Sequence, residues 1–146
     1  MAEACTLSID AAVTGGVNVV EWSPVKEHLL LSASKDPLIP LYDIRNAREP
    51  VHRLCGHVNQ KLQRCSHIYR PTFVADGSAI ATPGQGSKAL SLYSVDTGKA
   101  ISRGHLGYDA TMVMWANDAK ESTSVLWVAS RHISPLIPLW QGVNSG

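Results

Sequence analysis

Short apolar segments separated by turn-forming residues run through this chain of 146 residues. None of them keeps the 3.6-residue apolar period of an amphipathic helix. Short alternating or continuous apolar runs bounded by Gly, Pro, Asn, Asp or Ser are typical of β-strands. The segments with this pattern are residues 6–9, 17–22, 29–34, 38–44, 51–54, 68–73, 78–82, 90–93, 100–102, 111–115, 125–130 and 133–140. The sequence therefore predicts an all-β protein in which helix is scarce.

One strand pattern recurs along the chain, an apolar strand that ends in an aromatic residue. It occurs at 38–43, 90–94 and 136–141, where the aromatic residues are Tyr42, Tyr93 and Trp140. Such strands at an interval of roughly 50 residues are typical of a β-propeller, in which each repeat is a four-stranded blade. The pattern predicts blades at about 17–57, 66–105 and 108–141, with a lone outer strand at 5–10, in a single domain spanning 1–146.

Two kinds of dipeptide stand at the boundaries of these blades. They are Gly56-His57 and Gly104-His105 before a blade, and Tyr42-Asp43, Tyr93-Ser94 and Trp140-Gln141 at the end of a third strand. These positions resemble the Gly-His and Trp-Asp pairs of the WD-repeat (WD40) family. The resemblance implies a partial WD40-type β-propeller of about three four-stranded blades that acts as a protein–protein interaction scaffold and not as an enzyme.

The resemblance also implies structural roles for His57, His105, Asp36 and Trp140. In the family such residues form a buried hydrogen-bonded network with a Ser or Thr hydroxyl, here Ser32 or Ser34. A buried polar group without a partner costs about 1–3 kcal/mol. Gly15-Gly16 replaces the first Gly-His pair, and the turn at 84–87 has no Asp, so we expect weakened blades.

Three blades are fewer than the roughly four that a closed propeller requires. An incomplete propeller leaves unpaired edges, which favour association. The chain is therefore expected to be a fragment or short form of a larger propeller, or a unit that self-assembles through its open blade edges.

Residues 30–45 form the most specific functional candidate. They resemble the box by which WD-repeat proteins dock onto the damaged-DNA-binding adaptor of cullin-4 ubiquitin ligases. The resemblance implies that Tyr42, Asp43 and Arg45 bind the adaptor and that the protein is a substrate receptor. Because Asp43 and Arg45 lie two apart at a strand end, we expect both on one side, with Arg45 as a charged anchor. The alternative is that the box reflects blade structure alone, in a scaffold of another intracellular assembly such as chromatin, RNA processing or trafficking.

Composition narrows the class of protein further. The net charge is +1 and the Lys and Arg residues are scattered, so neither nucleic acid nor membrane is an expected partner. A hydrophobic content of 45% favours a folded domain over disorder. Three cysteines without a disulfide framework, and no pattern of a signal peptide, favour a reducing compartment, the nucleus and/or the cytoplasm.

Other candidate chemistry is weaker. His52, Cys55, His57, Cys65 and His67 include two Cys-x-His pairs, which could in principle ligate zinc, but the Cys-x₂-Cys spacing of zinc ribbons is missing. The segment 84–88 hints at a phosphate loop without its full frame. We therefore expect no metal, no cofactor and no catalytic residue.

Large side chains and loops complete the expectations. Trp22, Trp115 and Trp127 fall in predicted strands and are expected in the core or between blades. Arginines near strand ends, Arg70 among them, either form a rim that meets an acidic peptide or are simply solvated. The insertion at 58–64 is a second place for partner contacts.

Overall fold

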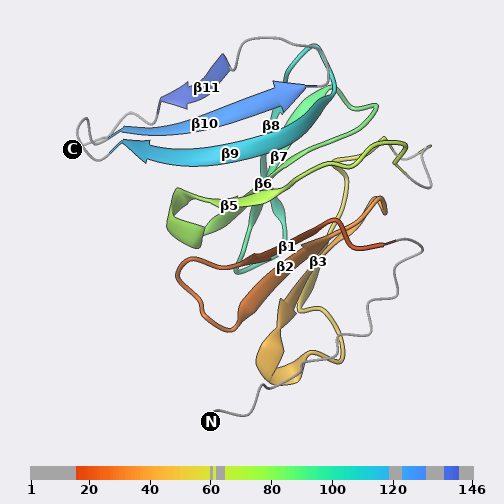
Figure 1. Cartoon of the computed structure of the whole chain (residues 1–146), viewed down its shortest axis with the longest axis vertical. Helices are drawn as coiled ribbons and strands as arrows, with labels where there is room; N and C mark the ends of the chain where they lie inside the picture. The colour runs from red at the N-terminus through yellow and green to blue at the C-terminus, as the bar shows by residue number, and fades with distance from the viewer. Residues whose placement is uncertain (1–15, 60, 62–64, 119–122, 131–136, 142–146) are drawn as a thin grey trace.

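Three antiparallel sheets follow one another along the chain and lie side by side in space (Figure 1). The computed structural model describes residues 16–59, 61, 65–118, 123–130 and 137–141. In these residues the sheets contain four, four and three strands, each sheet built from consecutive strands. The prediction of an all-β fold is confirmed, and the predicted lone strand at 5–10 lies outside the described residues.

The first sheet contains β1 (Val19–Trp22), β2 (Leu29–Ala33), β3 (Ile39–Asp43) and β4 (His52–Leu54). All five residues of β2 are buried, as expected for a central strand with an apolar sequence. Pro40 lies inside β3, where it pairs with Arg53 of β4. The pairing of β2 with β3 ends at Leu41, so the missing N–H of Pro40 interrupts no ladder to β2.

The second sheet contains β5 (Thr72–Val74), β6 (Ala79–Pro83), β7 (Ala89–Ser94) and β8 (Ala100–His105). A short 3₁₀ turn, η2 (Ala75–Gly77), joins β5 to β6, with φ of 54° at Asp76 and 82° at Gly77. The strand predicted at 68–73 pairs with β6 only from Thr72 onward. Pro71 has no N–H to donate, and Arg70 instead makes a parallel bridge to Met112 of the third sheet.

The third sheet contains β9 (Ala110–Asp118), β10 (Thr123–Ser130) and β11 (Ile137–Gln141). β9 and β10 are the longest strands described, and their register shifts between Ala129 and Ser130. The strand predicted at 133–140 is described from Ile137 onward.

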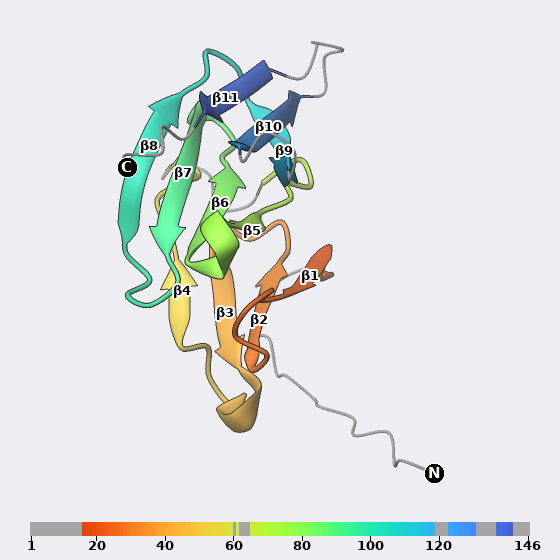
Figure 2. The same cartoon turned by 90° about the vertical axis from the view of Figure 1, so that its left-hand side faces the viewer.

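Two apolar clusters fill the two spaces between the sheets. The first lies between sheets one and two and includes Leu31, Leu41, Phe73 and Ile80. The second lies between sheets two and three and includes Leu90, Val113, Leu126 and Val128. Figure 2 shows the sheets turned so that their stacking along the molecule is visible. The core is therefore a pair of layers between blades.

The tryptophans do not all join these layers. The side of β1 that carries Trp22 is exposed, and Trp22 itself is 53% exposed, so its expected place in the core is wrong. Trp115 is partly buried and packs against the second cluster. β1 and β9 are both edge strands, so the difference lies in the face that carries each side chain: Trp115 packs against the cluster between the second and third sheets, whereas Val20 and Trp22 share a face of β1 that is exposed.

Candidate functional site

The segment of the predicted docking box ends in a short turn at the end of β3. Tyr42 is 3% exposed, and Asp43 is the last residue of the strand. A 3₁₀ turn, η1 (Ile44–Asn46), follows, and Asp43 caps it by accepting a hydrogen bond from the backbone N–H of Arg45 at 3.0 Å. Arg45 therefore lies in η1 and not on the strand, which corrects the expected reason for its closeness to Asp43. We call Tyr42, Asp43, Ile44 and Arg45 the β3 turn.

Asp43 and Arg45 form a two-pronged ion pair within this turn. The Nε of Arg45 donates to Oδ1 of Asp43 at 2.9 Å, and Nη2 donates to Oδ2 at 2.6 Å. The hydrogen bonds from Arg45 lower the pKa of Asp43 to about 2 and raise that of the guanidinium. The side chain of Arg45 is still 67% exposed, whereas that of Asp43 is only 16% exposed. The carboxylate therefore fixes the direction of a guanidinium that remains open to solvent.

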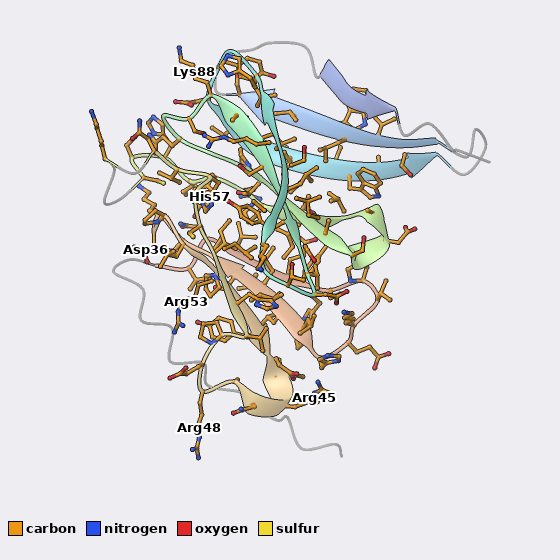
Figure 3. All side chains as sticks on the ribbon, turned by 180° about the vertical axis from the view of Figure 1, so that it is seen from behind. Asp36, Arg45, Arg48, Arg53, His57 and Lys88 are labelled. Atoms are coloured by element: carbon orange, nitrogen blue, oxygen red, sulfur yellow. The ribbon has the colours of Figure 1, made fainter. Side chains whose placement is uncertain are left out.

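The half-buried His28 lies beside the β3 turn, and Arg48 lies at the same end of the molecule. His28 Nε2 lies 4.0 Å from Oδ2 of Asp43, and the backbone oxygen of His28 accepts from the N–H of Ile44 at 2.9 Å. Figure 3 shows Arg45 and Arg48 at the same end of the molecule, with His57 in its interior. The turn is thus held by the β1–β2 connection and points away from the core.

His57 lies at the centre of a buried polar cluster between the first two sheets. It is 0% exposed, and its Nε2 and Nδ1 lie 3.4 Å and 3.5 Å from the hydroxyl oxygens of Tyr69 and Tyr93. The Tyr69 hydroxyl donates to the backbone oxygen of Asp36 at 2.5 Å, and that of Tyr93 to the oxygen of Cys55 at 2.6 Å. Burial, with a smaller effect of the Arg103 charge, lowers the pKa of His57 to about 4. The histidine is therefore neutral at pH 7, and its cluster joins the chain segments at residues 36, 55–57, 69 and 93.

The other predicted structural positions are placed differently. The Oδ2 of Asp36 accepts from the Ser34 hydroxyl at 3.1 Å, and that hydroxyl oxygen accepts from the Asp36 N–H at 3.0 Å. His105 is the last residue of β8 and is exposed, opposite Ala89. It therefore has no counterpart of the burial that surrounds His57. Trp140 lies in β11.

The Cys–His cluster does not converge on a metal site. Cys65 is buried and Cys55 exposed, and both are free thiols. Burial raises the pKa of the Cys65 thiol, which disfavours the thiolate that would ligate zinc. In the described part of the chain, no group of three or more His, Cys, Asp or Glu side chains is placed to hold a metal ion.

The segment 84–88 is a structural loop held by residues that the sequence did not single out. Asp109 accepts hydrogen bonds from the backbone N–H groups of Gly86 at 2.9 Å and Lys88 at 3.0 Å. A Cβ on Gly84 would stand 1.6 Å from the backbone oxygen of His57, so only glycine fits there. The turn at 84–87 has no Asp of its own. Asp109, which directly precedes β9 of the third sheet, supplies the carboxylate instead.

Comparison with known proteins places the fold. No family model matches the sequence. The chain is 35% identical over 48 residues to the ribosome biogenesis protein WDR12 homolog of Ixodes scapularis, a match that covers 33% of this chain and 11% of that protein. None of the helices described is long and apolar enough to cross a membrane.

A solved structure covers much more of the chain. The crystal structure of the WD40 beta propeller domain of Doa1 superimposes with a TM-score of 0.60 at 16% sequence identity. The superposition covers 84% of this chain and 36% of that one, so the chain spans little more than a third of the solved relative. With its three consecutive antiparallel sheets, the chain has the fold of part of a WD40-type β-propeller.

Proposed function

We propose that the chain is a protein-interaction scaffold that performs no chemistry itself. The fold supports this, because a WD40-type propeller offers strand ends and loops as rigid platforms. In the buried polar cluster around His57, the two tyrosine hydroxyls donate to backbone carbonyl oxygens, and His57 itself is closed to solvent. This cluster is therefore unsuited to catalysis. The compartment proposed with this role is the nucleus and/or the cytoplasm.

The more specific proposal is a substrate receptor of a cullin-4 ubiquitin ligase that docks through the β3 turn. One observation carries it: Asp43 holds the guanidinium of Arg45 in a two-pronged ion pair while 67% of the arginine side chain stays exposed. A pre-oriented guanidinium loses less conformational entropy on binding than a free one. Tyr42 would support the turn from beneath, since it is buried. The ligase would then transfer ubiquitin to a substrate held elsewhere on the scaffold.

A second candidate is a scaffold in an assembly without a ligase, in particular one of ribosome biogenesis. The observation that favours it is the 35% identity over 48 residues to the WDR12 homolog, whose name describes such a role. In this case the β3 turn would be blade structure and Arg45 an ordinary surface residue.

Direct binding distinguishes the two. Calorimetric titration of the purified cullin-4 adaptor with the wild-type chain, Arg45→Ala and the control Arg53→Ala tests the docking role, with circular dichroism to confirm equal folding. Arg53 is exposed on β4 and has the same charge. We expect binding by the wild type and the control, and about a tenfold or larger loss for Arg45→Ala. A folded wild type that does not bind would exclude the receptor role and leave the second candidate.

A further inference from the structure

An apolar hollow opens between the second and third sheets beside β8, the edge strand of the second sheet. Its volume is about 460 Å³, within the range of small-ligand sites. One wall contains Leu90 and Leu92 of β7. The other contains Trp115 of β9 and Leu126 of β10. None of the described residues that line it is a Lys, Arg, Asp or Glu, so the hollow suits an uncharged occupant.

The space exists because the second sheet presents small residues where it faces the third. Ser102 pairs with Leu92, and Gly104 pairs with Leu90, so these positions share the face that turns toward the hollow. All six residues of β8 are exposed, and a Cβ on Gly104 would meet no atom within 4 Å. Ala79 of β6 is another small residue in this wall. The hollow is therefore free space beside a packed layer, which a ligand could fill without displacing a neighbour.

Trp115 brings a polar group to the opposite wall. Its side chain is half-buried and packs against the second cluster, and in the described part of the chain its buried Nε1 has no hydrogen-bond partner. A buried N–H without an acceptor is costly. Because the indole borders the hollow, a small turn of its ring toward the free space would present this N–H to an acceptor on a ligand. The flat ring would also stack on an aromatic ligand.

The lining disfavours other kinds of occupant. An extended peptide would carry several N–H and C=O groups into apolar surroundings, where each needs a partner. A charged ligand would meet no opposite charge among the described lining residues. The polar side chains there are those of Ser78, Ser102, His105 and Trp115, and two of these lie on the exposed strand β8. The lining therefore matches a small molecule with an apolar body and few polar atoms.

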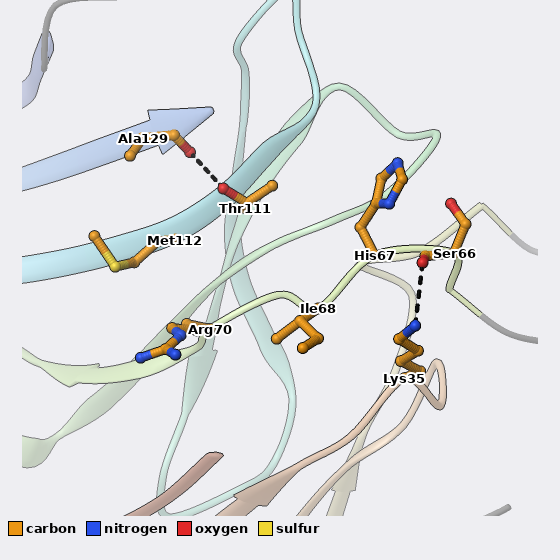
Figure 4. Close-up of a pocket in the computed structure, with 8 residues that line it drawn as sticks. All are labelled: Lys35, Ser66, His67, Ile68, Arg70, Thr111, Met112 and Ala129. Atoms are coloured by element: carbon orange, nitrogen blue, oxygen red, sulfur yellow. Dashed lines mark hydrogen bonds between the residues drawn. The ribbon is translucent and has the colours of Figure 1, made fainter. Parts of the chain in front are cut away.

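The hollow between the first and third sheets offers no comparable match. Its volume is similar, about 480 Å³, but its two cations, Lys35 and Arg70, lie on either side of Ile68 (Figure 4). The guanidinium of Arg70 points away from Lys35, so no single group on a ligand meets both. The apolar hollow beside β8 is thus the better-defined site of the two.

We propose that the hollow beside β8 binds a neutral, planar, ring-bearing small molecule with a hydrogen-bond acceptor, its ring system between Leu92 and Trp115 and its acceptor at the indole N–H. A volume of about 460 Å³ accommodates a fused-ring molecule with short substituents. This role goes beyond the proposed scaffold function and depends on neither the adaptor nor Arg45.

Fluorescence titration with prodan, a neutral naphthalene that carries a ketone and a dimethylamino group, tests this, because its emission shifts to the blue in apolar surroundings. Gly104→Leu and Ser102→Leu each extend a side chain into the hollow, and Trp115→Phe removes the N–H. Gly16→Leu is the matched control, since a Cβ there also meets nothing within 4 Å. We expect saturable binding by the wild type and the control, about a tenfold loss for each hollow-filling variant and about a fourfold loss for Trp115→Phe. Circular dichroism confirms equal folding.

Saturable binding that survives both hollow-filling variants would place prodan on an exposed apolar surface, such as that of Val20 and Trp22, and would overturn the proposal. Absence of binding to the folded wild type would overturn it too. Unchanged binding by Trp115→Phe would overturn the contact to the indole N–H. Loss of prodan binding as the chain concentration rises would mean that a second copy fills the hollow, which also contradicts the proposal.

The two proposed sites can be tested separately. Arg45→Ala should leave prodan binding unchanged, and Gly104→Leu should leave adaptor docking unchanged. Failure of adaptor docking is therefore distinguishable from failure of the hollow.

Discussion

The two layers between the blades are built differently. The layer between the first and second sheets combines large apolar side chains with the polar cluster around His57. It is also tied across by Glu21, whose Oε1 accepts from the Thr72 hydroxyl at 3.0 Å and from the Phe73 N–H at 3.3 Å. Lys26, between β1 and β2, also forms an ion pair with Asp96, between β7 and β8. Apolar burial and directional contacts therefore act on the same pair of sheets.

The layer between the second and third sheets is looser. Three of its eight buried members are the small residues Ala79, Ala81 and Ala110. A hollow of about 460 Å³, lined among others by Leu92, Ile101 and Trp115, opens beside it. Among the residues that the structure describes, the buried Nε1 of Trp115 has no hydrogen-bond partner, whereas the ring nitrogens of His57 lie against tyrosine hydroxyls. The same kind of sheet packing thus gives one layer that is well packed and hydrogen-bonded across, which we call the tight layer, and one with smaller side chains and a hollow beside it, which we call the loose layer.

The largest expected effect is a cavity in the tight layer. Leu31, which is 0% exposed, should cost about 3–4 kcal/mol in free energy of unfolding when replaced by Ala, because its well-packed neighbours cannot collapse. Leu126→Ala in the loose layer should cost about 2 kcal/mol, since surroundings next to a hollow relax more easily. Urea unfolding of both variants measures the contrast. A larger loss for Leu126→Ala would reverse the comparison.

The pH dependence of stability should report on His57. Its pKa is 6.5 in the unfolded chain and about 4 in the fold, so the unfolded state binds the proton first as the pH falls. Stability is therefore complete above pH 6.5 and is lost between pH 6.5 and 4, by up to about 3 kcal/mol. Urea unfolding over this window measures the slope. His57→Gln should flatten it, and a wild type with constant stability there would contradict the buried neutral histidine.

A glycine substitution tests the close contact between the loop at 84–88 and the backbone of His57. Gly84→Ala places a Cβ 1.6 Å from the backbone oxygen of His57 and should destabilise the chain by about 2–3 kcal/mol through overpacking. Gly104→Ala is the matched control, because nothing lies within 4 Å of its Cβ. It should change the melting temperature little. Equal melting temperatures for the two variants would show that the loop at 84–88 does not press on His57.

The smallest expected effect concerns a single hydroxyl. Tyr69→Phe removes the hydroxyl that donates to the backbone oxygen of Asp36 and lies against Nε2 of His57. The free energy of unfolding should fall by about 1–2 kcal/mol. Tyr108→Phe, at a half-buried position beside the loose layer, should cost less than about 0.5 kcal/mol. Thermal unfolding compares the two. Similar losses would mean that the polar cluster adds nothing to the apolar packing.

Much of the fold could be predicted because its signals are local. Apolar runs bounded by turn residues located the eleven strands of the three described sheets in the right order, and the repeated strand ending in an aromatic indicated blades. The exact start of β5 could not be predicted, since it depends on a bridge between Arg70 and Met112, far apart in sequence. The exposure of Trp22 likewise depends on which face of β1 a neighbouring sheet covers.

The candidate sites were less accessible to sequence reasoning. Asp43 and Arg45 were expected on one side of a strand end. Neither the 3₁₀ turn that contains Arg45 nor the ion pair between the two side chains was predicted, because two residues at this spacing come close together in a strand end and in a turn alike. The roles of Gln85 and Asp109 depend on loops from different sheets meeting in space.

The most direct test of the proposed docking end is hydrogen exchange of the chain with and without the purified cullin-4 adaptor, followed by mass spectrometry. Adaptor binding should slow exchange of amides in η1 and in the connection to β4, around Arg45 and Arg48. The amides around Lys35 and 65–70 should be unchanged. Slowing confined to the amides around Lys35 and 65–70, or to the third sheet, would contradict docking through the β3 turn.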